Sequence, residues 1–333
     1  MIPSTESTAP PELDADLLKR MLSHMVRARV LDERMWVLNR QGRAPFVISC
    51  QGHEAAQVGM AMALRPGHDW IAPYYRDLAL TLVIGMTPLD HLLATLARAD
   101  DPNSGGRQMP SHFGCRRLNI ITGGSPVATQ VLHAAGAALA SQVRGEDAVA
   151  FTSLGDGSTS EGDFHEGINF AAVHNLPLIC LVENNGFAIS VPWEKQSHTK
   201  NVADRALGYG IPGVIVDGGD VVACHVAAVD AVARARRGDG PTLIEAKVAR
   251  LTPHSSDDDD RAYKTRKQLA EEKAHDCLLR FRTQLEQWGL LAEGDYDRLR
   301  RDAMHEVDRA LEEAESAPLP TPESALLHVT AEG

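Results

Sequence analysis

Residues 148–189 read AVAFTSLGDGSTSEGDFHEGINFAAVHNLPLICLVENNGFAI, and this stretch decides the fold. The apolar run 149–154 stops at Gly-Asp-Gly, which is typical of a buried parallel strand. Ser160 and Asp163 then resemble a capping box at the start of a helix with an apolar stripe. Residues 178–182 form a second apolar run. The stretch therefore predicts a βαβ unit with two parallel strands.

Polar residues follow both predicted strands. Asp156 comes after the first and Asn185 after the second. If the strands are adjacent, their carboxyl ends lie about 4.8 Å apart, so both side chains reach the crevice where open α/β sheets bind ligands. The turn at Gly157 offers backbone N–H groups at the start of a helix, which suits phosphate. Gly-Asp-Gly alone is a common turn, but the whole arrangement indicates a Mg²⁺–diphosphate site.

Composition excludes several classes of protein. The chain has 333 residues and a net charge of −12, which argues against nucleic-acid binding. It contains no run of 18 apolar residues, so we expect no transmembrane helix and no membrane partner. The N-terminus has neither the basic nor the apolar region of a secretory signal. Five scattered cysteines without C-x-x-C spacing favour reduced thiols and a cytoplasmic location.

The rest of the chain alternates helical and strand patterns. We predict further strands over 214–216 and 242–248, and helices over 13–41, 54–64, 78–97, 131–143, 221–237 and 267–317. This order is typical of an α/β fold, a doubly wound parallel sheet flanked by helices, here with helical N- and C-terminal extensions. We expect a disordered tail over 1–12, a single domain over 13–317 with its core at about 119–250, and a loose C-terminal tail over 318–333.

Several separate motifs resemble one family. Gly-Asp-Gly followed by Asn-Asn is similar to the thiamine diphosphate motif. The stretches SCQGHEAAQVG, DWIAPYYRD, GRQMPSHFG, GGSPVATQ, ENNGFAISVP and RLTPHSSDDDDRAY extend the similarity over residues 46–264. Together they resemble the α subunit of the decarboxylating first component of 2-oxo acid dehydrogenase complexes. SPVATQ and PHSSDDD resemble the branched-chain (2-oxoisovalerate) type more than the pyruvate or acetoin types.

The resemblance implies a thiamine diphosphate-binding fold and a role for each matching residue. Mg²⁺ would be held by the side chains of Asp156 and Asn185 and the carbonyl group of Phe187. The cofactor would contact Tyr75, Arg76, Gly157 and Ser158 at its diphosphate, and the backbone around Ser125 and Val127 at its aminopyrimidine ring. A K⁺ ion, as in branched-chain relatives, would lie near Gly124, Pro126, Thr129 and Gln130.

The resemblance also implies two residues for the chemistry. His254 would be the active-site histidine, and the aspartates beside it in sequence favour a protonated imidazole. Phe46 would line the substrate pocket. Ser255 and Ser256 stand where animal relatives are phosphorylated, but the sequence does not predict phosphorylation here. The C-terminal TPESALLHVTAEG lacks the acidic and aromatic character usual in the family.

The implied activity is oxidative decarboxylation of branched-chain 2-oxo acids, with transfer of the acyl group to a lipoyl domain of an acyltransferase core. The enzyme class also needs a glutamate at the aminopyrimidine ring from a second α/β domain. This chain has one sheet, and Glu161, Glu166 and Glu183 lie on its diphosphate side, so we expect a β subunit in a tetramer of two α and two β chains.

Three alternatives remain open. The substrate could be pyruvate or acetoin. A transketolase-like half-chain would need more basic residues for a sugar phosphate than Arg76 and the pair Arg116-Arg117. A non-catalytic diphosphate-binding scaffold would need neither a second chain nor lipoyl chemistry.

Overall fold

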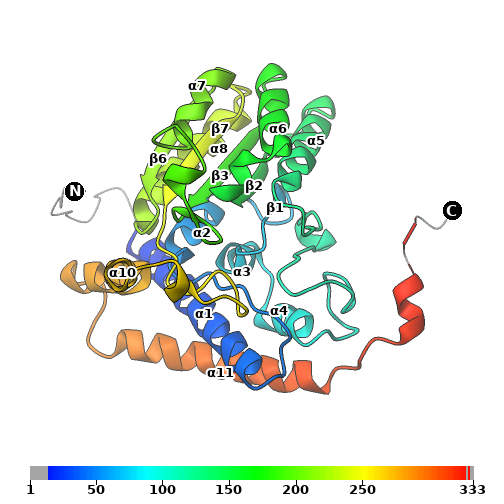
Figure 1. The fold of residues 1–333 in the computed structure, drawn as a ribbon, viewed down its shortest axis with the longest axis vertical. Coiled ribbons are helices and arrows are strands. Elements are labelled where there is room, and N and C mark those ends of the chain that lie inside the picture. Colours follow the sequence, from blue (N-terminus) through cyan, green and yellow to red (C-terminus); the bar gives the residue numbers. More distant parts are fainter. Residues whose placement is uncertain (1–13, 328, 331–333) are drawn as a thin grey trace.

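A parallel five-stranded sheet forms the centre of the molecule (Figure 1). A computed structural model describes residues 14–327 and 329–330, so the disordered tail predicted over 1–12 lies outside the described residues. The strand order is β1-β2-β3-β7-β6. The strands are β1 (Trp70–Ala72), β2 (Ala150–Gly155), β3 (Leu178–Asn184), β6 (Gly213–Asp217) and β7 (Thr242–Lys247). A small antiparallel pair follows β3 and consists of β4 (Phe187–Ala188) and β5 (Val191–Pro192).

Helices cover both faces of the sheet. One face carries α2 (Glu54–Ala61), α3 (Leu78–Ile84) and α8 (Val221–Arg236). The other carries α5 (Thr129–Val143), α6 (Gly162–Val173) and α7 (Ala206–Tyr209). Successive strand residues point to opposite faces, so Phe151 and Ile179 pack against the first set of helices and Leu178 and Cys180 against the second. The predicted doubly wound α/β fold is confirmed.

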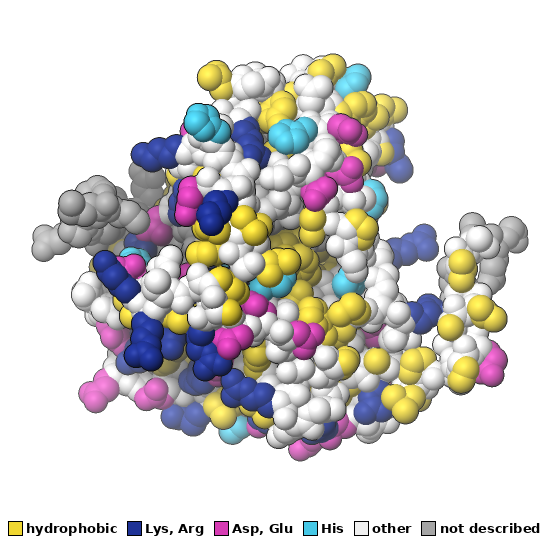
Figure 2. All heavy atoms as spheres, in the orientation of Figure 1, with side chains coloured by type: hydrophobic (Ala, Val, Ile, Leu, Met, Phe, Trp, Pro, Cys, Tyr) yellow, Lys and Arg dark blue, Asp and Glu magenta, His cyan; other side chains and the backbone are white. Residues whose placement is uncertain are grey.

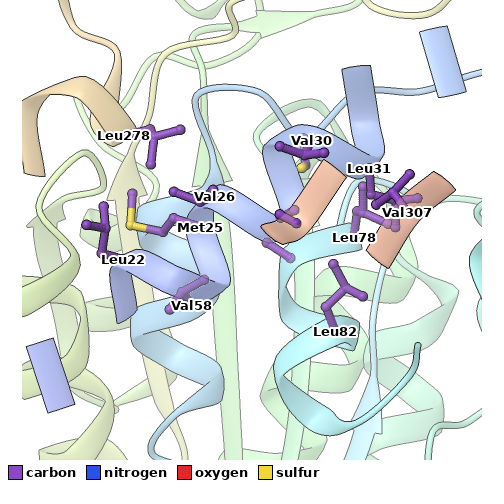
Figure 3. Close-up of a cluster of buried hydrophobic side chains, with 14 of the residues drawn as sticks. Leu22, Met25, Val26, Val30, Leu31, Val58, Leu78, Leu82, Leu278 and Val307 are labelled. Atoms are coloured by element: carbon purple, nitrogen blue, oxygen red, sulfur yellow. The ribbon is translucent and has the colours of Figure 1, made fainter. Parts of the chain in front are cut away.

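A further layer of helices packs α1, near the start of the described residues, against α11, near their end. It contains α1 (Ala15–Arg40), α4 (Pro88–Thr95), α10 (Cys277–Gln287) and α11 (Asp295–Ser316), and the exposed α9 (Arg266–Ala274) precedes α10 in the chain. Val30 and Leu31 of α1 lie beside Val307 of α11 and Leu78 of α3 (Figure 3). Ion pairs flank this seam between Arg27 and Glu306, Glu33 and Arg300, Arg34 and Asp308, and Arg43 and Glu315. Burial of one such apolar side chain contributes about 1.5–3 kcal/mol and a partly exposed ion pair about 0–1 kcal/mol, so the apolar seam dominates.

Three segments differ from the expected pattern. The helical region predicted over 267–317 is divided into α9, α10 and α11. The helix predicted over 78–97 is two helices, because Gly85 ends α3 at a φ of 119° and Thr87 caps α4 with a capping box. The edge strand β1 lies outside the predicted strands, and its Trp70 N–H donates to the carbonyl of Val149 at 2.9 Å. Over the described part of the chain, no helix combines the length and hydropathy that a membrane span requires.

Candidate functional site

The carboxyl ends of β2 and β3 lie side by side at the centre of the sheet. The two strands pair in parallel, with Gly155 opposite Glu183. Asp156 and Asn185 are the next residues along each strand, and both line one cavity. Asn184 instead turns away, because its amide nitrogen donates to Oε1 of Glu245 at 2.7 Å. Of the two consecutive asparagines, only Asn185 is therefore available to a ligand in the cavity.

Asp156 is a buried carboxylate whose hydrogen-bond partners are neutral. It is 1% exposed, and Nε2 of Gln196 donates to its Oδ2 at 3.0 Å. Burial raises the pKa of Asp156 more than the hydrogen bonds from Gln196 and from the backbone of Asn185 lower it. A bound cation would relieve this cost, and Asn185 adds an amide oxygen. These donors fit Mg²⁺, which prefers oxygen ligands.

The cavity has a volume of about 420 Å³. Hydrophobic and histidine side chains gather around a recess in the middle of the face shown in Figure 2. The residues predicted from the sequence that line the cavity are Phe46, Tyr75, Arg76, Ser125, Val127, Asp156, Gly157, Ser158, Asn185, Phe187 and His254. These residues come from loops up to about two hundred positions apart in the sequence, and the fold brings all of them to one place.

The turn at Gly157 leaves no room for a side chain. A Cβ atom there would lie 2.5 Å from Cβ of Ala188, so only glycine lets the backbone approach the cavity so closely. The helix predicted to start at Ser160 was placed wrongly, however. Residues Gly157–Ser160 form a short 3₁₀ turn, and α6 begins at Gly162 with Glu161 as its N-cap and no side-chain capping bond. The N–H groups at Gly157 therefore belong to a tight turn and not to the helix itself.

Arg76 supplies positive charge to the cavity. It is 2% exposed; its Nη1 donates to the carbonyl of Ser49 at 2.6 Å, and its Nε has no partner among the described residues. Burial acts to lower the pKa of Arg76, but Tyr74, Tyr75 and Glu183 raise it overall, so the guanidinium stays charged. A buried, charged guanidinium with a free N–H group suits a phosphate.

His254 reaches the cavity from the loop after β7, and its ring stands edge-on to Tyr75 with the ring centroids 6.1 Å apart. The predicted protonated imidazole is wrong. Burial, followed by the positive charges of Arg76 and Arg250, lowers the pKa of His254 to about 4, and Asp258 opposes this only weakly. Asp258 instead accepts the backbone N–H of His254 at 2.8 Å and shapes the loop.

The His254 loop is attached to the segment that carries Phe46. The backbone N–H of Val47 donates to Oγ of Ser256 at 3.1 Å, and the N–H of Ser256 donates to the carbonyl of Val47 at 2.9 Å. Ser255 is buried. These contacts hold Phe46 and His254 on the same wall of the cavity.

The residues expected around K⁺ do not all lie together. Gly124, Pro126 and Gln130 line a separate small cavity of about 10 Å³ under the loop before α5. Thr129 does not line it, and its hydroxyl donates to Oδ2 of Asp163 at 2.7 Å. Nε2 of Gln130 donates to the carbonyl of Ser153 at 2.9 Å. A cavity of this volume is about the size of one water molecule.

Glu183 lies beneath the cavity in a buried polar cluster. Its Oε2 contacts Nδ1 of His53 at 2.5 Å and accepts from Nε2 of Gln57 at 3.1 Å and from the hydroxyl of Tyr74 at 3.2 Å. Burial raises the pKa of Glu183 to about 6. None of the described residues that line the cavity is a glutamate.

Sequence reasoning missed several residues at the site. The cavity is also lined by Ile48, Tyr74, Met109, His112, Gly155, Ala188 and Ile189. Met109 and His112 lie in the quoted stretch GRQMPSHFG, so the motif itself was a signal. Gln196, which donates a hydrogen bond to Asp156, has no motif around it and could be found only from the structure.

Comparisons with known proteins identify the family of this chain. The family model described as dehydrogenase E1 component matches residues 22–323. The chain is 53% identical over 311 residues to the 2-oxoisovalerate dehydrogenase subunit alpha of Bacillus subtilis, which covers 93% of this chain and 94% of that protein. It is 40% identical over 303 residues to the 3-methyl-2-oxobutanoate dehydrogenase subunit alpha of Mycobacterium tuberculosis, covering 91% and 80% of the two chains.

A third relative is the pyruvate dehydrogenase E1 component subunit alpha of Bacillus subtilis, 40% identical over 311 residues, covering 93% of this chain and 81% of that one. The family match spans most of the chain and includes every segment that lines the cavity. The resemblance inferred from the motifs is confirmed: the chain belongs to the dehydrogenase E1 component family of 2-oxo acid dehydrogenases, a family that implies thiamine diphosphate as the cofactor.

Proposed function

We propose that the chain is the α subunit of a branched-chain 2-oxo acid dehydrogenase. It would decarboxylate the acid and pass the acyl group to a lipoyl domain. One observation carries the proposal: the carboxylate of Asp156 and the amide of Asn185 follow adjacent strands and share a cavity with Arg76 and His254. This arrangement would provide oxygen ligands for a metal ion, a positive charge for an anionic group and a histidine for the chemistry at one place.

The side chains of Asp156 and Asn185 and the carbonyl group of Phe187 would hold Mg²⁺. Arg76 and the turn at Gly157 would bind the diphosphate, together with Tyr75 and Ser158. The backbone around Ser125 and Val127 would bind the aminopyrimidine ring. When bound, thiamine diphosphate supplies a nucleophilic carbon and an electron sink for decarboxylation.

His254 would assist acyl transfer as a hydrogen-bond donor. Its Nδ1 faces Nη2 of Arg76 at 3.5 Å, and arginine only donates. The neutral ring therefore carries its proton on Nε2. Because the pKa of His254 is about 4, the ring stays neutral at physiological pH, and its Nε2–H group can donate a hydrogen bond to an oxygen that gains negative charge in the cavity.

The substrate class follows from the relatives and from the cavity wall. Two of the relatives named above act on 2-oxoisovalerate, which is 3-methyl-2-oxobutanoate, and one is 53% identical to this chain. Phe46, Ile48, Met109 and Ile189 give the cavity apolar surface suited to a branched aliphatic chain. Pyruvate or acetoin is the second candidate, because a pyruvate dehydrogenase subunit is 40% identical.

Turnover of 3-methyl-2-oxobutanoate and pyruvate by the same α–β preparation, with a lipoyl domain as acceptor, tests the substrate class. We expect a higher kcat/KM for the branched acid. A preference for pyruvate would transfer the proposal to the pyruvate type. Arg76 is the only Lys or Arg among the described lining residues, which gives no support to a transketolase-like half-chain or its sugar phosphates.

The proposed function needs a partner chain. The class requires a glutamate at the aminopyrimidine ring, and the nearby Glu183 is buried and already bonded to His53 and Gln57. We propose a β subunit, two of each chain, with a lipoyl-bearing acyltransferase core as the next partner. The chain purified alone should show no decarboxylation, and full activity without a partner would contradict this assembly.

Two finer points belong to the same proposal. The small cavity at Gly124, Pro126 and Gln130 is our candidate for K⁺, tested by comparing cofactor affinity in potassium and in sodium buffers. Equal affinities in both would argue against a K⁺ site. The cysteines are all free and buried, which supports a reducing compartment such as the cytoplasm.

A further inference from the structure

His112 and Ser125 form a hydrogen-bonded pair on the cavity wall. Nε2 of His112 lies 2.7 Å from Oγ of Ser125. Both residues line the main cavity, together with Val127. Neither the resemblance nor the proposed mechanism gives His112 a role.

The contacts on the other side of the ring determine where its proton lies. Nδ1 of His112 is 3.0 Å from the carbonyl oxygen of Met109 and 3.3 Å from that of Pro110. Carbonyl oxygens only accept hydrogen bonds, so Nδ1 must carry the proton. In the neutral ring, Nε2 is then unprotonated and accepts the hydroxyl proton of Ser125.

The backbone fixes the distance between the two residues. The N–H of Gly123 donates to the carbonyl of Phe113 at 2.9 Å, and Cys115 and Ile120 exchange two hydrogen bonds of 3.0 Å. Ser111, immediately before His112, has a φ of 68°, a conformation that non-glycine residues seldom adopt. Such strain persists only where the surroundings impose it, and it is often found at functional sites.

The direction of the Ser125 hydroxyl decides what the serine can recognise. With its proton directed to His112, Oγ presents only lone pairs to the cavity and can accept but not donate. A 2-oxo acid offers only carbonyl and carboxylate oxygens, which are acceptors. Of the two molecules that the proposed function places in this cavity, only the cofactor carries a donor, the amino group on its pyrimidine ring.

We propose that His112 is a positioning residue that holds Ser125 Oγ as a hydrogen-bond acceptor for the amino group of the aminopyrimidine. The proposal rests on the proposed function, because it requires thiamine diphosphate in this cavity. It adds a side-chain contact to the backbone contacts expected around Ser125 and Val127.

Binding of two cofactors tests the pair. Calorimetry on the full chain with its β partner and Mg²⁺ would compare thiamine diphosphate with its 4′-deamino analogue, which lacks the amino group. We expect Ser125→Ala and His112→Asn to weaken thiamine diphosphate binding roughly three- to tenfold, the value of one neutral hydrogen bond. Binding of the analogue should not change. Asparagine can still donate to the Met109 and Pro110 carbonyls, so it removes only the contact with Ser125.

His112→Gln is the matched control. Its side-chain amide can place an acceptor where Nε2 lies, so it should keep near-normal affinity for thiamine diphosphate. The double variant of Ser125→Ala and His112→Asn should lose no more affinity than either single variant, because both remove the same contact. Equal losses for both cofactors, or no loss for either, would overturn the proposal.

A readout without cofactor separates this proposal from the proposed function. Nitrogen-15 NMR of the full chain with its β partner should show His112 protonated on Nδ1 and unprotonated on Nε2. The opposite tautomer would overturn the pair whatever the cofactor does. If the wild-type assembly showed the expected tautomer but bound neither cofactor, the proposed function would fail, and the recognition role of Ser125 with it.

Discussion

Replacing Asp156 with asparagine should remove metal-dependent cofactor binding while leaving the fold intact. Asp156 is the only Asp or Glu among the described residues that line the cavity, so the variant takes away the sole negative charge offered to Mg²⁺. Asparagine has the same shape. Without cofactor, the variant loses at most one hydrogen bond but no longer buries a charge. These two changes have opposite effects on the free energy of unfolding, each of about 1 kcal/mol.

The size of the effect follows from binding linkage. Loss of a direct metal ligand should weaken cofactor binding by about a hundredfold, since loss of an outer partner of a ligand already costs 10- to 100-fold. At a cofactor concentration 100 times the wild-type Kd, bound cofactor stabilises the wild type by about 2.7 kcal/mol. The same concentration equals the Kd of the variant and stabilises it by about 0.4 kcal/mol.

Thermal unfolding of the chain with its β partner measures this difference. With about 2 °C per kcal/mol for a protein of this size, the cofactor should raise the Tm of the wild type by about 5 °C and that of Asp156→Asn by less than about 1 °C. Chelation of Mg²⁺ should abolish the wild-type shift. Asp217→Asn is the matched control, because Asp217 ends β6 at the same edge of the sheet but bonds to Arg280 outside the cavity.

If the cofactor raised the Tm of Asp156→Asn as much as that of the wild type at the same concentrations, the metal assignment would be refuted. A low Tm of the empty variant, well below that of the empty wild type, would instead show that Asp156 is part of the structural core. Both results are read from one set of melting curves.

Three further results are expected. His254→Ala should keep the cofactor-induced Tm shift but slow acyl transfer to a lipoyl domain about a hundredfold; a normal transfer rate would remove His254 from the mechanism. Gly157→Ala should cost about 1–3 kcal/mol in urea unfolding, since its Cβ meets Ala188 at 2.5 Å, and an unchanged free energy would contradict the close approach. Burial raises the pKa of Asp32 to about 7, so the folded state holds this proton more tightly than the unfolded state. The free energy of unfolding should therefore fall by up to about 4 kcal/mol as the pH rises from 4 to 7. Asp32→Asn should flatten this pH dependence in unfolding curves measured across the same range.

The central βαβ unit could be predicted from the sequence because its signals are local. The apolar runs, the glycine turn and the spacing from Asp156 to Asn185 all lie within one stretch of about forty residues. The edge strand β1 could not be predicted, since it has three residues and depends on pairing with β2 across eighty positions. The break at Gly85 before Pro88 was visible in the sequence, but the apolar pattern on both sides outweighed it.

The charge state of His254 shows why part of the site escaped sequence reasoning. Its neighbours in sequence are aspartates, which favour a protonated ring. The larger charge effect comes from Arg76, which lies almost 180 residues earlier in the sequence, and buried Arg250, four positions before His254, adds to it. The electrostatic potential at a site depends on distance through space, and a motif records only the order of residues along the chain.

The seam between α1 and α11 has a consequence for biosynthesis. Helix α1 buries part of its apolar face against α11, which is encoded some 280 residues later. At ordinary translation speeds the interval is on the order of tens of seconds. During that time Val307 does not yet cover Val30 and Leu31, so the nascent chain exposes an apolar surface until α11 is made. A chain terminated before residue 295 would leave that apolar surface exposed, and chaperones or proteases would bind it.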